Sequence, residues 1–194
     1  MDFLATFFDN YGMLLAQGTW DTLLMTIVST FFAYVIGIPL GVLCVLTSPK
    51  GLMPHRIFNM VLGWIINIGR SIPFIILLVA LIPFTRFIVG TSLGVPGAIV
   101  PLVISAAPFI ARMVEQSIEE VDGGLVEAAQ SFGANTWQIV YKVFLREALP
   151  SLVRGFAIVF ITILGYSAMA GCSVPAVWVI SRSATAISAT RTMS

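Results

Sequence analysis

The sequence predicts an all-α fold, a polytopic bundle of membrane-spanning helices, on three observations. Of the 194 residues, 58% are hydrophobic and only 10% are charged, whereas soluble domains carry about 25% charged residues. Four apolar runs are long enough for a helix to cross the hydrocarbon core, which takes about 20 residues. The alternation of apolar and polar residues that marks a membrane barrel does not occur.

The segment before the first apolar run is acidic. Residues 1–21 contain Asp2, Asp9 and Asp21 but no Lys or Arg. A cleavable secretory signal begins with basic residues and ends at a small-residue cleavage site. We therefore expect the first span to be retained.

The four expected spans are residues 22–47, 58–84, 88–110 and 156–180. Arg70 is the only charged residue inside them, and an ionisable residue within a span is a candidate functional residue. A helix break at Pro73 would instead bring Arg70 to the interface, where its side chain would reach the headgroups. The prolines of these runs indicate either an irregular translocation path or simple kinks and loop ends.

The basic residues predict the orientation. Lys50 and Arg56 follow the first run, and Arg112, Lys142 and Arg146 flank or occupy the polar segment after the third. Lys and Arg concentrate in short cytoplasmic loops. We therefore expect the N-terminus outside the cell and the polar segment, residues 115–150, in the cytoplasm.

The pattern of the polar segment predicts two short amphipathic helices. Val121, Leu125, Ala128 or Ala129, and Phe132 recur at helical spacing, and Gly133 then ends the first helix in a left-handed conformation. Asn135 followed by Gln138 fits a capping box. The second helix is expected to carry its apolar residues on one face, formed by Trp137, Val140 and Phe144.

Three roles are open to such a segment: lying on the membrane surface, binding DNA, or docking a protein. Surface-lying helices use Lys and Arg to meet anionic lipid. Here the first helix is expected to carry five acids and no base after Arg112; the acids are Glu115, Glu119, Glu120, Asp122 and Glu127. Phosphate would repel those acids. A cytoplasmic protein partner is therefore the favoured role.

The same segment resembles a known family. Glu127, Ala128 and Ala129, followed by Gly133 and by the downstream sequence EALP that ends in Leu149 and Pro150, resemble the EAA coupling loop of ABC importer permeases. We call residues 115–150 the coupling loop. The resemblance implies that it is cytoplasmic, that its short helices sit in a groove of an ATPase subunit, and that these residues and Trp137 form the docking site.

The resemblance extends over most of residues 19–171, to the permease subunits of bacterial methionine importers. It rests on the sequences RSIPFIILLVALIPFTRFIVGTS, AAPFIARMVE, GANTWQIVYKV and GYSAMAG. It implies a multi-pass protein of the bacterial inner membrane with five spans, a homodimer of permeases, two ATPase subunits, and a periplasmic or lipoprotein methionine-binding protein. Arg146 stands where the family usually has a proline, which predicts a longer or differently ended docking helix.

Two groups of residues are candidates for the translocation pathway or gate. Arg70 and Pro73 lie in the second run, and Tyr166, Ser167 and Met169 lie in GYSAMAG. The small residues of that segment permit close helix packing, at the permease dimer interface or at the gate. Cys44 and Cys172 are read as packing residues and His55 as solvated, because a zinc site or disulfide framework needs more ligands at recognisable spacing.

The chain is expected to bind no cofactor and to catalyse no reaction itself. A Walker A glycine–lysine loop is absent, so ATP would bind to a separate subunit. The expected function is methionine import, of both D- and L-forms. The alternatives are a permease for another small amino acid, a stand-alone secondary transporter, which would show intramembrane acids or inverted repeats, and a membrane enzyme.

The last residues do not continue the resemblance. Residues 1–171 form the expected transmembrane domain, whereas 172–194 are unlike the family's next segment. A shift of the codons by one base gives a continuation similar to the family's. We therefore expect residues 172–194 to be a frameshift product, genuine or a sequencing error, without evolved function, and the family's fifth span to be missing.

Overall fold

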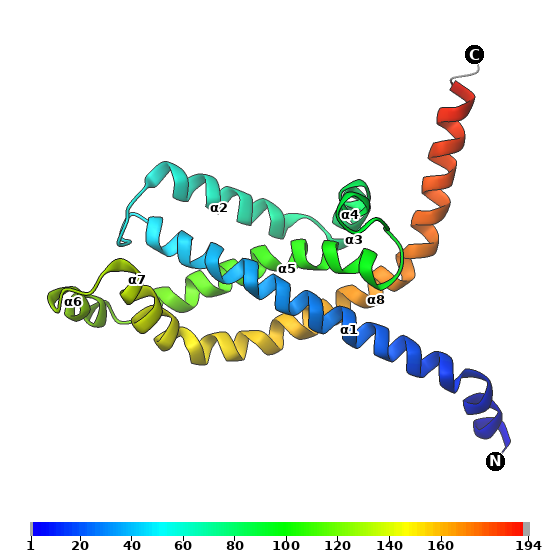
Figure 1. Ribbon diagram of the computed structural model, residues 1–194, viewed down its shortest axis with the longest axis horizontal. Coiled ribbons are helices and arrows are strands. Elements are labelled where there is room, and N and C mark those ends of the chain that lie inside the picture. The colour runs from blue at the N-terminus through cyan, green and yellow to red at the C-terminus, as the bar shows by residue number, and fades with distance from the viewer. Residues whose placement is uncertain (1, 192–194) are drawn as a thin grey trace. The chain divides into compact units, whose positions relative to one another are not determined.

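The computed structural model describes residues 12–171 in full, and beyond them only the helical backbone of residues 2–11 and 172–191. The described chain is helical, with no strand in that part (Figure 1). The elements in chain order are α1 (Asp2–Thr47), α2 (Arg56–Ser71), α3 (Phe74–Ala80), α4 (Ile82–Val89), α5 (Gly94–Glu119), α6 (Gly123–Ser131), α7 (Thr136–Ile139), the π-helical segment η1 (Val140–Phe144) and α8 (Leu145–Arg191).

The expectation of an all-α membrane bundle is confirmed. Within the described residues, three helices are long and apolar enough to cross a membrane: Gly12–Thr47, Gly94–Glu119 and Thr136–Gly171. A fourth span is possible only as a broken one, because α2 and α3 together pass the same test but are bent by 105°. Exposed apolar side chains along these helices, such as Phe31, Trp64 and Ile161, suit contact with lipid.

The second expected span is therefore interrupted, as a break at Pro73 would require. Ile72 ends α2 in an extended conformation, with φ −79° and ψ 123°. The residue before a proline is pushed out of the helical region by the proline ring. The run 58–84 is thus divided between α2, α3 and the first residues of α4, and residues 88 and 89 belong to α4.

The third span begins later in the structure than the sequence predicted. We placed its start at Ile88, but α5 begins at Gly94. Gly90 and Gly94 have φ of 79° and 71°, in the left-handed region that an apolar L-residue avoids. The chain turns between them, and a count of apolar residues does not detect such a turn.

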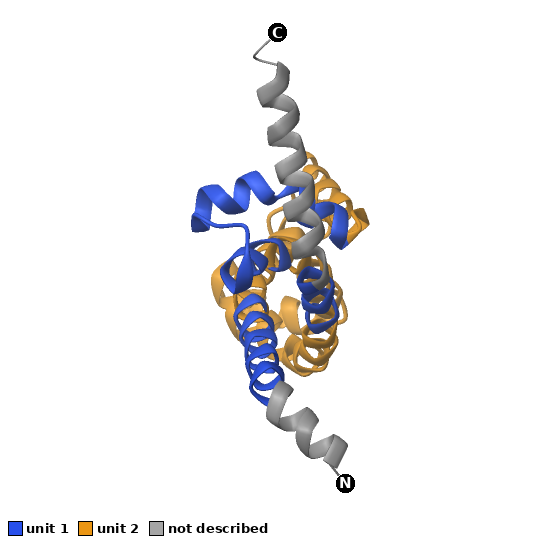
Figure 2. Ribbon diagram, turned by 90° about the vertical axis from the view of Figure 1, so that its right-hand side faces the viewer, with its two compact units in different colours: residues 1–29, 74–102, 163–194 blue, residues 30–73, 103–162 orange. Residues whose placement is uncertain are grey.

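Two compact units make up the chain, coloured separately in Figure 2. Unit 1 holds residues 12–29, 74–102 and 163–171 of the fully described part, and unit 2 holds residues 30–73 and 103–162. The expected frameshifted tail, with Cys172, lies outside the fully described residues, as do Asp2 and Asp9.

Unit 2 is built around α5. Its core contains Cys44, Leu62, Ile66 and Ala111, with Leu40 packed against it. Cys44 is buried, which confirms it as a packing residue. Asn59 fastens α2 to α1, since its side-chain amide donates to the Cys44 carbonyl oxygen at 2.7 Å.

Two glycines of α1 allow it to approach α5 closely. A Cβ atom on Gly37 would lie 2.6 Å from Ile110 Cγ2, and one on Gly41 would lie 2.5 Å from the Ala111 carbonyl oxygen. Real Cβ atoms do not come so close to other atoms. Glycines four residues apart let membrane helices pack backbone against side chain, so this spacing fixes the α1–α5 contact within unit 2.

Candidate functional site

The first short helix of the coupling loop, α6, has a side-chain cap. The Asp122 side chain accepts a hydrogen bond from the Gly124 backbone N–H at 2.8 Å, which satisfies one free donor at the start of α6. Glu115 and Glu119 lie on α5. The expected strongly acidic first helix is therefore wrong: α5 continues past the apolar run, and α6 keeps only Glu127 within its bounds.

The glycine turn between the two short helices is confirmed. Gly133 has φ 76°. The backbone N–H of Ala134 donates to the Ala129 carbonyl oxygen at 3.0 Å, and that of Gly133 donates to Gln130 at 2.9 Å. These bonds close the end of α6 as a left-handed residue does at many helix ends.

The expected capping box is also present. The Asn135 backbone N–H donates to Gln138 Oε1 at 2.9 Å, and the Asn135 side chain accepts from the Thr136 backbone N–H at 2.7 Å and from the N–H of Gln138. Three backbone N–H donors at the start of α7 are thereby satisfied. Gly133, Asn135 and Gln138 thus determine the geometry of the turn in the coupling loop.

The second short helix buries a different set of residues from the one expected. Val140 and Phe144 are buried, but Trp137 is 71% exposed. The expected common face is therefore wrong for Trp137. Trp137 lies on α7, before the π-helical segment that begins at Val140. The side of this helix that packs inward carries Ile139 and Val140, both buried.

Large aromatic side chains are exposed on the coupling loop. Phe132 is 92% exposed and Tyr141 is 75% exposed. We call Phe132, Trp137 and Tyr141 together the aromatic surface, a name that records their shared exposure. Large apolar side chains mark interaction sites where they form a contiguous patch, and aromatic residues are enriched in protein interfaces. The sequence interpretation did not place Phe132 or Tyr141 among the docking residues.

The predicted docking residues are close in the sequence to these three aromatic residues. Glu127 and Ala128 are exposed on α6, and Ala129 is half-buried there. Leu149 and Pro150 are exposed on α8. The helix runs through Pro150 without a break, since Thr136–Gly171 is continuous, which agrees with the longer docking helix expected from Arg146.

The candidate pathway residues fall in different units. Arg70 and Pro73 are exposed and belong to unit 2, where the Arg70 guanidinium lies 5.8 Å from the centre of the Phe109 ring. This distance fits a cation–π contact. Arg70 lies in the last turn of α2, just before the break at Pro73, so it does not sit in the middle of an unbroken span.

The second candidate group belongs to unit 1. The Tyr166 ring stacks on Phe74 with centroids 4.7 Å apart and planes 1° from parallel. Ser167 is buried, and its hydroxyl donates to the Leu164 carbonyl oxygen at 2.8 Å. Met169 is exposed. Both Tyr166 and Ser167 therefore have packing roles inside the chain, and their role in a gate stays a prediction.

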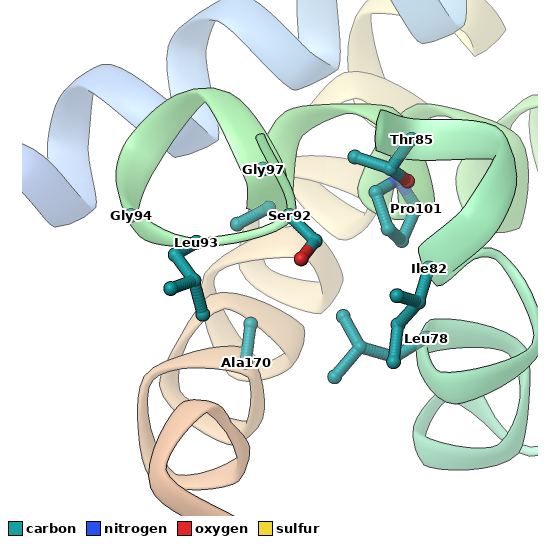
Figure 3. Close-up of a pocket in the computed structure, with 10 residues that line it drawn as sticks. Leu78, Ile82, Thr85, Ser92, Leu93, Gly94, Gly97, Pro101 and Ala170 are labelled. Carbon is teal, nitrogen blue, oxygen red and sulfur yellow. The ribbon is translucent and has the colours of Figure 1, made fainter. Parts of the chain in front are cut away.

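Unit 1 also contains a small cavity beside α4 and α5 (Figure 3). Its volume is about 20 Å³, room for about one water molecule. Thr85, Ser92 and Pro101 are among its lining residues, and the buried Thr85 hydroxyl has no hydrogen-bond partner among the described residues. In this conformation the cavity is too small for an amino-acid-sized solute.

Within the described residues, no three His, Cys, Asp or Glu side chains gather into a possible metal site. The membrane-length helices and the exposed two-helix loop define a helical membrane protein with a projecting polar loop. Residues 37–172 match the family described as binding-protein-dependent transport system inner membrane component. The chain belongs to this family.

Close relatives carry more specific names. The D-methionine transport system permease protein MetI of Yersinia pestis is 56% identical over 158 residues, which are 81% of this chain and 73% of the relative. The MetI protein of Escherichia coli (strain K12) is also 56% identical, over the same shares of both chains. A chain of the MetNI methionine ABC transporter, solved in inward facing conformations, has a TM-score of 0.83 and 53% identity, covering 85% of this chain and 76% of that one.

Proposed function

We propose that this chain is the membrane permease subunit of an ATP-driven importer that carries methionine across the bacterial inner membrane. The observation that carries the proposal is the 56% identity, over 81% of the chain, to permease proteins named for D-methionine transport. The matched fold of a methionine ABC transporter chain supports it.

A protein pathway is needed because methionine is a zwitterion. An isolated charge in hydrocarbon costs several kcal/mol or more, on the order of the translocon-scale values for charged side chains. Two copies of the permease would shield the solute between them. A periplasmic or lipoprotein methionine-binding protein would deliver it, with the N-terminus of each permease outside the cell.

The coupling loop would receive the mechanical input. Its helices would sit on an ATPase subunit, with the aromatic surface buried against the partner and Glu127 near a basic or backbone-donor site. Closure of two ATPase subunits would then move the loops of the two permeases toward each other. The permease changes conformation and forms no covalent bond with the solute.

ATP binding would belong to the ATPase subunits, because the chain has no Walker A sequence. A stand-alone secondary transporter would instead draw on an ion gradient, and the described spans carry few ionisable groups for ion coupling. Arg112 and Glu115 on α5 are two such groups. They form an ion pair, with Arg112 Nη1 and Glu115 Oε2 2.6 Å apart, so their charges compensate each other.

The proposal is tested with the permease and its ATPase subunit reconstituted together in liposomes, with the binding protein added. Uptake of labelled methionine should require ATP and should be competed by unlabelled D- and L-methionine but not by an unrelated amino acid. Preferred uptake of another amino acid would replace methionine as the substrate. Uptake driven by an ion gradient without ATP would overturn the importer assignment.

A further inference from the structure

Two serine side chains meet at the base of the coupling loop. Ser117 lies on α5 and Ser151 on α8, and both belong to unit 2. Their hydroxyl oxygens are 2.9 Å apart, and Ser117 is only 4% exposed. The pair therefore joins the helix that enters the coupling loop to the helix that leaves it.

Both hydroxyl protons can be donated in hydrogen bonds at this contact. Ser117 Oγ is also 2.8 Å from the carbonyl oxygen of Met113. A serine hydroxyl has one proton and two acceptor sites. If Ser117 donates to Met113, Ser151 donates to Ser117, and each proton has an acceptor without help from solvent.

The same two helices touch again one turn away. Gly155 on α8 lies one turn beyond Ser151, and Met113 on α5 lies one turn before Ser117. A Cβ atom on Gly155 would collide with the Met113 sulfur. Matching contacts one turn apart on both helices show that α5 and α8 pack antiparallel with a defined register at this end.

We infer that Ser117 and Ser151 are positioning residues that make the base of the coupling loop a rigid joint. This inference rests on the proposed function. A push from the ATPase on the loop can move the spans only if α5 and α8 move with the loop. The hydrogen bond holds the two helices in one register, so displacement of the loop is passed to both helices instead of being lost in sliding between them.

Packing alone would not set this register as sharply. Apolar contacts are not directional, and the neighbouring Met113 side chain is flexible and adapts to different surroundings. A hydrogen bond, such as that between the buried Ser117 hydroxyl and the half-buried Ser151 hydroxyl, has a narrow range of distance and angle. Sliding one helix by a turn would break the Ser117–Ser151 hydrogen bond, whereas the bond from Ser117 to Met113 lies within α5 and would remain.

The test uses the complete transporter with Ser117→Ala, Ser151→Ala and the double variant. Thr162→Ala is the matched control, because the Thr162 hydroxyl on α8 donates to Ile158 of its own helix. ATP hydrolysis and methionine uptake are measured on equal amounts of assembled complex. We expect the number of ATP molecules hydrolysed per methionine imported to rise about fivefold or more in both single variants, and no further in the double variant. Ser151→Thr, which keeps the hydroxyl, should stay near the wild-type ratio.

A purely structural role would lower the yield or heat stability of the complex without changing this ratio. An unchanged ratio in all serine variants therefore overturns the inference, as does an equal change in Thr162→Ala. Failure of the proposed function is a separate result, because the wild-type transporter would then show no ATP-dependent methionine uptake at all.

A cross-link gives a second, independent measurement. Ser117→Cys and Ser151→Cys are combined in a background in which Cys44 and Cys172 are replaced by alanine. If the joint stays closed through the transport cycle, the oxidised disulfide form should import methionine as well as the reduced form. Loss of uptake on oxidation that reduction restores, or failure of the two cysteines to cross-link, contradicts a permanently closed joint.

Discussion

Gly133→Val should uncouple the two short helices of the coupling loop. Gly133 has φ 76°, and a Cβ atom there would meet nothing within 4 Å. The cost is therefore one of backbone conformation and not of collision, about 1–2 kcal/mol for an L-residue in the left-handed region. A penalty of this size lowers the population of the native turn about 5- to 30-fold. Recovery of the ATPase subunit with the tagged permease and methionine uptake should both fall, while the amount of permease in the membrane stays normal.

Two other variants separate the turn from the side chain. Gly133→Asn should retain assembly and uptake, because asparagine tolerates the left-handed region better than other residues. Gly123→Val is the matched control, since a Cβ at Gly123 also meets nothing within 4 Å and its φ is not positive. If Gly133→Val assembles and transports like the wild type, a fixed left-handed turn is not needed for coupling.

Three further changes test other parts of the structure. Glu127→Lys should weaken binding to the ATPase by up to a few kcal/mol, seen as a lower yield of the complex. Better liposome binding by the variant, with unchanged complex yield, would instead indicate a loop that lies on lipid. Gly41→Ala should cost about 1–3 kcal/mol by overpacking against α5, seen as a lower melting temperature in detergent, whereas Gly63→Ala should not, because a Cβ there meets nothing within 4 Å. Thr85→Val should leave the melting temperature equal or higher, because the Thr85 hydroxyl is buried without a partner among the residues that the structure describes; a clear decrease would show that an ordered water bonds to it.

The turn of the coupling loop could be predicted from the sequence because its causes are local. Gly133, Asn135 and Gln138 are neighbours in the chain, and each acts through backbone groups within a few residues. The break at Pro73 has the same origin, since a proline acts on the residue before it. Features of this kind do not depend on what the rest of the chain does.

Contacts between distant residues could not be predicted in this way. Ser117 and Ser151 are 34 residues apart in the sequence, and no periodic pattern brings them together. The exposure of Trp137 was misjudged because apolar spacing does not tell which side of a short helix packs inward: Ile139 and Val140 are buried, whereas Trp137 is exposed. That choice depends on residues distant in the sequence, and a local pattern does not report it.

Small residues in a membrane helix have different meanings that only the packing separates. At Gly37 and Gly41 the space that a side chain would need is filled by α5. At Gly165 and Gly171, in the segment expected at the dimer interface or gate, a Cβ atom would meet nothing within 4 Å. Gly37 and Gly41 therefore allow close packing of helices inside the chain, whereas no neighbouring helix of the described chain packs closely against Gly165 or Gly171. Open space at Gly165 and Gly171 is what a second permease copy or a moving gate at this segment requires, and a sequence that shows glycine at all four positions does not distinguish these two uses.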